Sequence, residues 1–473
     1  MKQSFETVLN YFQQICVIPH GSGNTAGIRQ WCLDTANALG LDAYADEPGN
    51  VIIRKPASAG YEAHPGVILQ GHMDMVCAKL PDCPKNMETE GLDLIRDDAA
   101  GILYADGTTL GADDGVAVAY AFAVLADNTL PHPKLTVIIT VDEETGMDGA
   151  TGLAPAELTG QYLINIDSEE EGVLTVGCAG GVRNHLHFPC ETAEVTGTAV
   201  RFTVSGLTGG HSGAEIHKPL LNANLAALEI LRAVKTPFSL AAFSGGVRDN
   251  VIPTECSAEL ITNSGDTVRE EIEAAFAALK RNNPQETGMA LAVSQTEGYT
   301  CTALTADAAA KLLDTLSVLP NGVQQMNEAL GMPQTSLNLG VFSLNGGEMQ
   351  VDALVRSGVN AEKYVLADTL KAIAENAGGT AERSGDYAAW EYKPGTALER
   401  TAAEVFAAQY GKVPEIVTIH AGLECGILSA KAPQLECISI GPDIPDIHTP
   451  RERLPLDSAE RTWEYLLALL KAL

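Results

Sequence analysis

The sequence predicts an α/β protein. A discontinuous domain with a mostly parallel central sheet between helices is interrupted by an inserted α+β domain of two similar units. Strand-like apolar runs alternate with helical segments up to about Gly180, alternating strands then take over, and the first pattern returns near the C-terminal end. A chain of 473 residues also exceeds what one hydrophobic core usually supports. We therefore expect domain segments at 1–182, 183–385 and 386–473.

The first segment contains the expected central sheet. Helical spacing of apolar residues predicts helices at 5–15, 27–39 and 115–125. Apolar runs predict strands at 51–53, 67–70, 135–141 and 162–166. Residues 78–110 contain two prolines and many acids, so we expect a loop or hairpin there.

The inserted segment is predicted to contain two similar α+β units, one after the other. Its first part predicts strands at 185–188, 200–204 and 258–262 and helices at 220–234 and 268–279. Its second part predicts helices at 306–316 and 361–376 and strands at 336–345 and 349–357. The final segment predicts a helix at 397–409, strands at 416–419 and 436–440, and a helix at 456–473 behind Pro455.

Composition excludes several classes of function. The formal charge of -31 comes from 61 acidic and 30 basic side chains, and such a surface repels nucleic acids. The longest apolar run, 116–126, is too short to cross a membrane. The ten cysteines are scattered, and the first residues do not resemble a signal peptide. We expect a cytoplasmic protein with no nucleic-acid or membrane partner.

Polar side chains follow the predicted strands. His72 and Asp74 come after one strand, Glu143 and Glu144 after another, and Asp167 after a third. The carboxyl ends of parallel strands meet at one edge of a sheet, where ligands bind. Imidazole and carboxylate groups are the usual donors for zinc-like metals. The pattern predicts a site for one or two divalent metals.

Each pair offers two different roles. In an extended segment His72 and Asp74 point the same way, so one can bind metal while the other orients it. Asp113 and Asp114 precede a helix, and we expect one to cap it and the other to bridge two metals. Of Glu143 and Glu144, one can bind metal while its neighbour takes a proton from water.

A loop histidine, His448, follows the last predicted strand and is the last candidate for the metal site. Together these motifs resemble the dinuclear zinc peptidases that include carnosinase, peptidase T and glutamate carboxypeptidase. The resemblance runs from the Pro19-His20-Gly21-Ser22 region to His448-Thr449-Pro450-Arg451-Glu452. The motifs that carry it are Gly71-His72-Met73-Asp74-Met75-Val76, Gly111-Ala112-Asp113-Asp114-Gly115, Asp142-Glu143-Glu144-Thr145-Gly146 and Asn165-Ile166-Asp167-Ser168-Glu169-Glu170.

The resemblance implies an activity and a role for each residue. It implies hydrolysis of dipeptides with free termini, including Xaa-His dipeptides, with two Zn2+ per subunit that Co2+ or Mn2+ can replace. His72 and Asp167 would bind one metal, Glu144 and His448 the other, and Asp113 both. Asp74 would orient His72, and Glu143 would be the general base.

The resemblance also implies that the inserted domain is a lid that forms a homodimer. His211, within Gly209-Gly210-His211-Ser212-Gly213, would stabilise the oxyanion. Arg356 and the backbone of Gly422 would hold the substrate carboxylate, and Asn250 is a further candidate for the same pocket.

Two alternatives remain open from the sequence. A related two-metal enzyme, such as a tripeptidase, a desuccinylase or an N-acyl amino acid deacylase, would share the metal set and differ in the lid. An inactive metal-binding scaffold is the second, although such a protein has no use for a base such as Glu143 beside the ligands.

Overall fold

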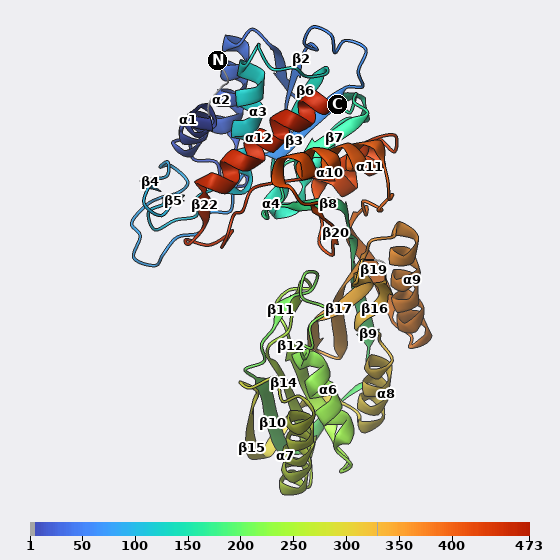
Figure 1. Ribbon diagram of the computed structural model, residues 1–473. Coiled ribbons are helices and arrows are strands. Elements are labelled where there is room, and N and C mark those ends of the chain that lie inside the picture. Colours follow the sequence, from blue (N-terminus) through green and yellow to red (C-terminus); the bar gives the residue numbers. More distant parts are fainter. Residues whose placement is uncertain (1–4, 329) are drawn as a thin grey trace. The chain divides into compact units, whose positions relative to one another are not determined.

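The computed structural model describes residues 5–328 and 330–473. The chain forms two compact units (Figure 1). The first contains the chain up to Cys178 together with residues 392–418 and 423–473, and the second contains residues 179–391 and 419–422. The first unit is therefore discontinuous and the second is inserted into it. The predicted fold class is confirmed.

The first unit is built on an eight-stranded sheet in the order β1-β2-β6-β3-β7-β21-β8-β20. At its centre β3 pairs in parallel with β6 and β7, and β7 pairs in parallel with β21. The strands are β1 (Asp42–Ala45), β2 (Val51–Lys55), β3 (Val67–His72), β6 (Leu135–Thr140), β7 (Tyr162–Asn165), β8 (Val173–Cys178), β20 (Glu415–Ile419) and β21 (Glu436–Ser439). Both β3 and β6 are buried along their whole length, because helices cover a parallel sheet on its faces.

Helices surround this sheet and share one apolar core with it. The longer ones are α1 (Phe5–Cys16), α2 (Ala26–Ala38), α3 (Ala112–Ala126), α10 (Ala397–Tyr410), α11 (Glu424–Lys431) and α12 (Leu456–Ala472). The short ones are α4 (Glu143–Gly146), α5 (Asp148–Gly152) and the 3-10 turn Pro155–Glu157. The expected hairpin within 78–110 is formed by β4 (Leu94–Asp97) and β5 (Ile102–Ala105), to which β22 (Arg453–Pro455) adds a third strand.

The second unit has a nine-stranded antiparallel sheet and its own core. The strands follow the order β14-β10-β15-β12-β17-β18-β9-β19, and β16 pairs with β17. They are β9 (Gly180–Pro189), β10 (Thr192–Ser205), β12 (Ser239–Gly245), β14 (Cys256–Thr262), β15 (Ala290–Leu304), β16 (Gly322–Asn327), β17 (Met332–Asn345), β18 (Glu348–Ser357) and β19 (Thr380–Tyr387). A separate pair consists of β11 (Gly210–His211) and β13 (Val251–Ile252). The helices are α6 (Ala223–Ala233), α7 (Gly265–Asn282), α8 (Ala306–Ser317) and α9 (Asn360–Asn376).

The strands of the two similar units expected in this segment lie in one continuous sheet, because β12 of the first half pairs with β17 of the second. The sequence did not predict β15, which is mostly exposed and pairs with β10 along nearly its whole length. Its stability comes from cross-strand pairing rather than from an apolar run. Within the described ranges, no helix has the length and apolar character needed to cross a membrane.

Candidate metal centre

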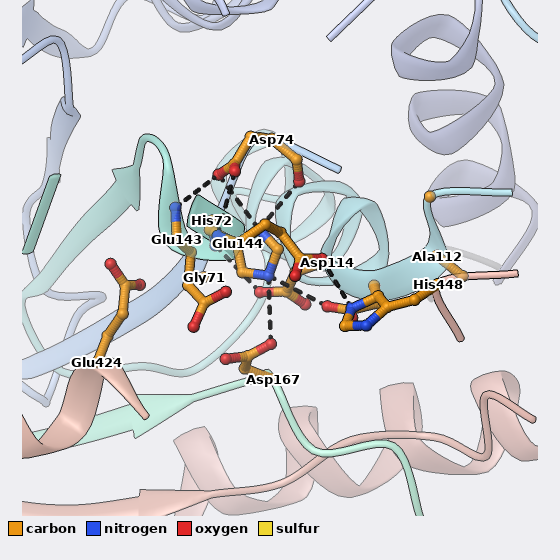
Figure 2. A network of polar contacts seen from close by, with 12 residues as sticks. Gly71, His72, Asp74, Ala112, Asp114, Glu143, Glu144, Asp167, Glu424 and His448 are labelled. Carbon is orange, nitrogen blue, oxygen red and sulfur yellow. Dashed lines mark hydrogen bonds and ion pairs between the residues drawn. The ribbon is translucent and has the colours of Figure 1, made fainter. Parts of the chain in front are cut away.

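The predicted site residues of the first unit gather at the carboxyl ends of the parallel strands. His72 is the last residue of β3, Glu143 and Glu144 begin α4 just after β6, and Asp167 lies two residues beyond β7. His448 comes from the loop between β21 and β22. Figure 2 shows the side chains of His72, Glu144, Asp167 and His448 pointing toward one another. The strand order thus brings together residues that are far apart in the sequence.

Asp113 lies between the two histidines. Its Oδ1 is 3.1 Å from Nε2 of His72, and its Oδ2 is 3.1 Å from Nε2 of His448. Nε2 of His72 is also 3.4 Å from Oδ1 of Asp167, and Nε2 of His448 is 2.9 Å from Oε1 of Glu144. Each oxygen of one carboxylate therefore faces a different cluster of donor atoms.

The arrangement fits metal binding. Ligand atoms of His72, Asp113 and Asp167 lie within 4.8 Å of one another, and so do those of Asp113, Glu144 and His448. Imidazole nitrogens and carboxylate oxygens at this spacing are the donor set that zinc-like cations take. A third group, His72, Glu143 and Glu144, has the same spacing, so the residues form overlapping groups that could each hold a metal ion.

Asp74 accepts hydrogen bonds from the residues that surround it, His72, Glu143 and Glu144. Its backbone carbonyl accepts a hydrogen bond from Nδ1 of His72 at 2.9 Å, which leaves Nε2 turned toward Asp113. Its carboxylate accepts the backbone N–H groups of Glu143 at 3.1 Å and Glu144 at 3.3 Å (Figure 2). The hydroxyl of Ser22, which the sequence did not single out, donates to the same carboxylate at 2.7 Å.

The pKa values of the acids in this cluster are shifted by their burial and by the charges of their neighbours. Burial raises the pKa of Asp167 to about 6, and the negative charges of Asp113 and Glu144 act in the same direction. The hydrogen bond with His72 opposes this shift. Burial also raises the pKa of Glu143 well above its usual range. Burial alone would raise the pKa of Asp113 too, but hydrogen bonds from His448 and His72 lower it overall. So many acids close together require protons or cations between them.

The predicted helix cap by one of the two aspartates is wrong. The start of α3 is kinked, because Asp113 (φ −82°, ψ 103°) and Asp114 (φ −119°, ψ 29°) are non-helical, and among the described residues neither carboxylate accepts an N–H of the following turn. Asp114 is buried, and its Oδ2 accepts the backbone N–H of His72 at 3.1 Å. Asp114 therefore holds the end of β3 in place instead of capping its own helix.

The second unit brings together His211 and Arg356. A methyl group at Gly213 would lie 3.0 Å from Cε1 of His211, 3.2 Å from Nε of Arg356 and 2.3 Å from the carbonyl oxygen of His420, so all three surround this glycine. Arg356 is only 5% exposed; its Nη1 donates to the hydroxyl of Tyr387 at 2.8 Å, and its Nε has no hydrogen-bond partner among the described residues. A buried guanidinium with an unused donor can accept an anion.

His211 is held as a neutral ring with a defined tautomer. Its Nδ1 accepts the backbone N–H groups of Gly213 at 3.3 Å and Ala214 at 3.1 Å. The proton must then sit on Nε2, which makes that atom a donor. Burial and the charge of Arg356 lower the pKa of His211.

The remaining candidates lie beside this cluster. The backbone carbonyl of Asn250 accepts the N–H of Ser212 at 3.0 Å. Gly422 lies two residues after His420, whose Nε2 is 2.7 Å from the hydroxyl of Ser336. Burial and the charge of Arg356 lower the pKa of His420 to about 3, so this ring is neutral. Local sequence does not reveal the contact of the buried His420, since its partner Ser336 is far away along the chain.

The sequence analysis also did not predict the contacts of two buried glutamates in the first unit, Glu424 and Glu452. Glu424 begins α11, and its Oε2 accepts hydrogen bonds from Gln70 at 2.5 Å and Thr140 at 2.6 Å. Glu452 accepts backbone N–H groups from the loop that carries Asp113. Both glutamates form hydrogen bonds with residues that are hundreds of positions away along the chain. The periodicity of a local segment cannot predict such contacts.

Comparison with known proteins places this geometry in context. The model of the peptidase family M20/M25/M40 matches residues 68–472. The cytosol non-specific dipeptidase of Escherichia coli (strain K12) is 35% identical over 468 residues, which cover 97% of this chain and 96% of the relative.

Solved structures agree with the sequence comparison. The crystal structure of the aminoacylhistidine dipeptidase from Vibrio alginolyticus matches with a TM-score of 0.89 and 33% identity, over 99% of this chain and 96% of the other. The aminopeptidase PepT from Bacillus cereus matches with a TM-score of 0.59 and 17% identity over 99% of this chain and 98% of the other, and so shows likeness of fold alone. The resemblance expected from the sequence is confirmed.

Proposed function

The chain belongs to the peptidase family M20/M25/M40, and from this premise we propose that it is a zinc-dependent dipeptidase that hydrolyses dipeptides with free termini, including Xaa-His dipeptides. The observation that carries the proposal is Asp113, whose two oxygens each lie 3.1 Å from a different histidine nitrogen. A carboxylate in this position serves as a bridge between two cations.

We assign the ligands by this geometry. His72 and Asp167 hold one Zn2+, and Glu144 and His448 hold the other, with Asp113 between them. Co2+ or Mn2+ can occupy the same nitrogen and oxygen donors. Cations held by these residues would supply Lewis acidity, which polarises a peptide carbonyl and lowers the pKa of water.

The remaining steps belong to side chains of the chain. Glu143 takes the proton of the attacking water and passes it to the leaving amine, a role suited to an acid whose pKa is raised by burial. Its backbone N–H is fixed by Asp74, which keeps the base in place. His211 offers its Nε2 proton to the carbonyl oxygen as negative charge develops there.

The second unit supplies recognition of the free carboxylate in this proposal. Arg356 binds it with its planar guanidinium, because Nε has no other hydrogen-bond partner among the described residues. The backbone of Gly422 and the side chain of Asn250 are assigned to the same task in this proposal. The proposal further includes a homodimer formed through the second unit and a cytoplasmic location, which the name of the Escherichia coli relative supports.

A substrate panel tests the proposal. Metal-free protein is reloaded with zinc, cobalt or manganese and assayed on Xaa-His dipeptides, other dipeptides, tripeptides and N-acyl amino acids. We expect cleavage of free dipeptides that requires metal. Faster cleavage of tripeptides or acylated amino acids would favour the related enzymes, and metal binding without hydrolysis would identify a scaffold.

A further inference from the structure

We propose that Glu452 is a positioning residue that joins the loop of Asp113 to the loop of His448 and thereby sets the affinity of the metal position formed with Glu144. The inference rests on the proposed function, because it concerns the same metal centre. It assigns to Glu452 a task that is separate from binding metal or substrate.

The carboxylate of Glu452 accepts four hydrogen bonds from the backbone that leads into and begins α3. Its Oε2 accepts the N–H of Leu110 at 2.8 Å and of Gly111 at 3.0 Å. Its Oε1 accepts the N–H of Ala112 at 2.7 Å and of Asp113 at 3.3 Å. Four consecutive amides, the last of them that of the bridging aspartate, are thus held by one side chain that is 2% exposed.

Glu452 also belongs to the segment that presents His448. Its N–H donates to the carbonyl of Thr449 at 3.1 Å, which closes a turn directly after the histidine. The following strand, β22, pairs with β5, so the segment is fixed on its other side as well. The left-handed φ of 59° at His448 shows that the loop is held in an unusual conformation.

The two loops therefore meet at one carboxylate. Asp113 and His448 lie 3.1 Å apart through Oδ2 and Nε2, and Glu452 connects the backbones from which both side chains extend. Groups that orient metal ligands change metal affinity by roughly 10–100-fold when they are removed. The connection by Glu452 fits that role.

The effect should differ between the two metal positions. His72 and Asp167 follow β3 and β7, and the hydrogen bonds of Glu452 reach neither residue. Loosening Glu452 should therefore weaken the position of Glu144 and His448 first. The position of His72 and Asp167 shares only Asp113 and should change less.

Glu452→Gln tests this with little change in shape. A glutamine keeps one accepting oxygen but turns an NH2 group toward two N–H donors, so one pair of hydrogen bonds is lost. We expect calorimetric titration of the metal-free variant with Zn2+ to show one binding step weakened about 10–100-fold. Glu452→Asp keeps the charge on a shorter side chain and should fall between the variant and the native chain.

Glu286 provides the matched control. It is 1% exposed, and its carboxylate accepts the N–H and hydroxyl of Thr208 at 2.8 Å each and the N–H of Leu221 at 2.9 Å. It lies in the second unit, away in sequence and in fold from every proposed ligand. Glu286→Gln should cost stability in the same manner while leaving both zinc affinities as in the native chain.

The outcomes separate the inference from the proposed function. If the native chain binds no zinc, the proposed function fails before any variant is compared. If the native chain binds two zinc ions and Glu452→Gln binds them as tightly, or weakens only as Glu286→Gln does, the positioning role is overturned. Should Glu452→Gln not fold, hydrogen exchange on the metal-free native chain decides: amides 110–113 must be protected, and exchange at the rate of an unstructured peptide would refute the role.

Discussion

The two adjacent aspartates show how neighbouring groups decide the role of a residue. Asp113 faces two imidazole rings, whereas the carboxylate of Asp114 turns back to the N–H of His72. Local sequence treats both as possible helix caps, because each stands at the start of a helix. The oxygens of Asp113 face the two imidazole rings and Oδ2 of Asp114 accepts the N–H of His72, so neither carboxylate serves the amides of the helix, and this is why the cap prediction was wrong.

Replacing Glu143 by glutamine separates catalysis from metal binding. An amide is a poor base, so turnover should fall about 10²–10⁴-fold. Zinc content, measured by atomic absorption, should remain that of the native chain, since Glu143 is not one of the proposed ligands. Loss of zinc together with activity would mean that the roles of Glu143 and Glu144 are reversed. Glu144→Gln is the comparison and should lose metal.

Arg356→Ala should act on recognition of the substrate carboxylate. Removal of one partner from a buried charged pair costs about 2–5 kcal/mol, so kcat/KM for free dipeptides should fall at least about 30-fold. A dipeptide blocked as a C-terminal amide should be a poor substrate for the native chain and be affected little by the substitution. Arg383→Ala is the control, since Arg383 pairs with Asp368 on an exposed part of the same unit.

An amide substrate cleaved as fast as the free acid by the native chain would contradict this role. Tyr387→Phe refines the test, because Tyr387 holds Nη1 of Arg356 at 2.8 Å. It should raise KM with kcat nearly unchanged.

At the scale of elements, the sequence predicted the starts of the strands that carry the site, and their ends to within two residues, but not the contacts around them. The strands expected at 67–70, 135–141 and 162–166 are β3, β6 and β7, and the residues beyond them converge as parallel pairing requires. Apolar runs reveal buried strands because burial is what selects them. Contacts that join distant segments, such as that of Glu424 with Thr140, follow from tertiary packing and leave no local pattern.

The group formed by Glu424, Gln70 and Thr140 predicts how stability depends on pH. Burial raises the pKa of Glu424 to about 7, whereas an unfolded glutamate titrates near 4.5. Between these values the folded chain binds more protons than the unfolded chain, so stability falls as pH rises. A shift of this size corresponds to about 3 kcal/mol.

Metal-free protein should therefore unfold at lower denaturant concentration at pH 8 than at pH 5. Hydrogen bonds to Asp113 and Glu144 raise the pKa of His448 to about 10, and this shift acts in the same direction, because a histidine with a raised pKa loses stability as pH rises. Glu424→Gln should flatten the dependence between about pH 4.5 and 7. An equally steep dependence in the variant would show that Glu424 does not contribute.

At the scale of the whole molecule, the chemistry is divided between two units. The first holds every proposed metal ligand and the base Glu143, and the second holds His211 and Arg356. In the proposed function, metal binding and proton transfer thus belong to the first unit and the oxyanion donor to the second. For the proposed homodimer, this division leads to the question of which subunit's metal centre His211 serves.

His211→Ala tests the proposed role of His211. Removing an oxyanion donor lowers turnover about 10²–10³-fold. Zinc content should stay native, because His211 is in the second unit and its ring contacts the backbone of Gly213 and Ala214. The neutral tautomer keeps the Nε2 proton at neutral pH, since burial lowers the pKa of the ring. His217→Ala, on a nearby histidine of the same unit, is the control and should retain activity.

Mixed dimers then show which subunit His211 serves. Inactive His211→Ala and inactive Glu143→Gln chains are combined, and subunit exchange is followed with differently tagged chains. If His211 acts on the partner subunit's site, a mixed dimer contains one site with both an intact Glu143 and an intact His211, and activity should return to about half of the native value in the fraction that is mixed. If His211 serves its own chain, every site lacks one of the two groups, and exchange without recovery of activity would exclude the trans arrangement.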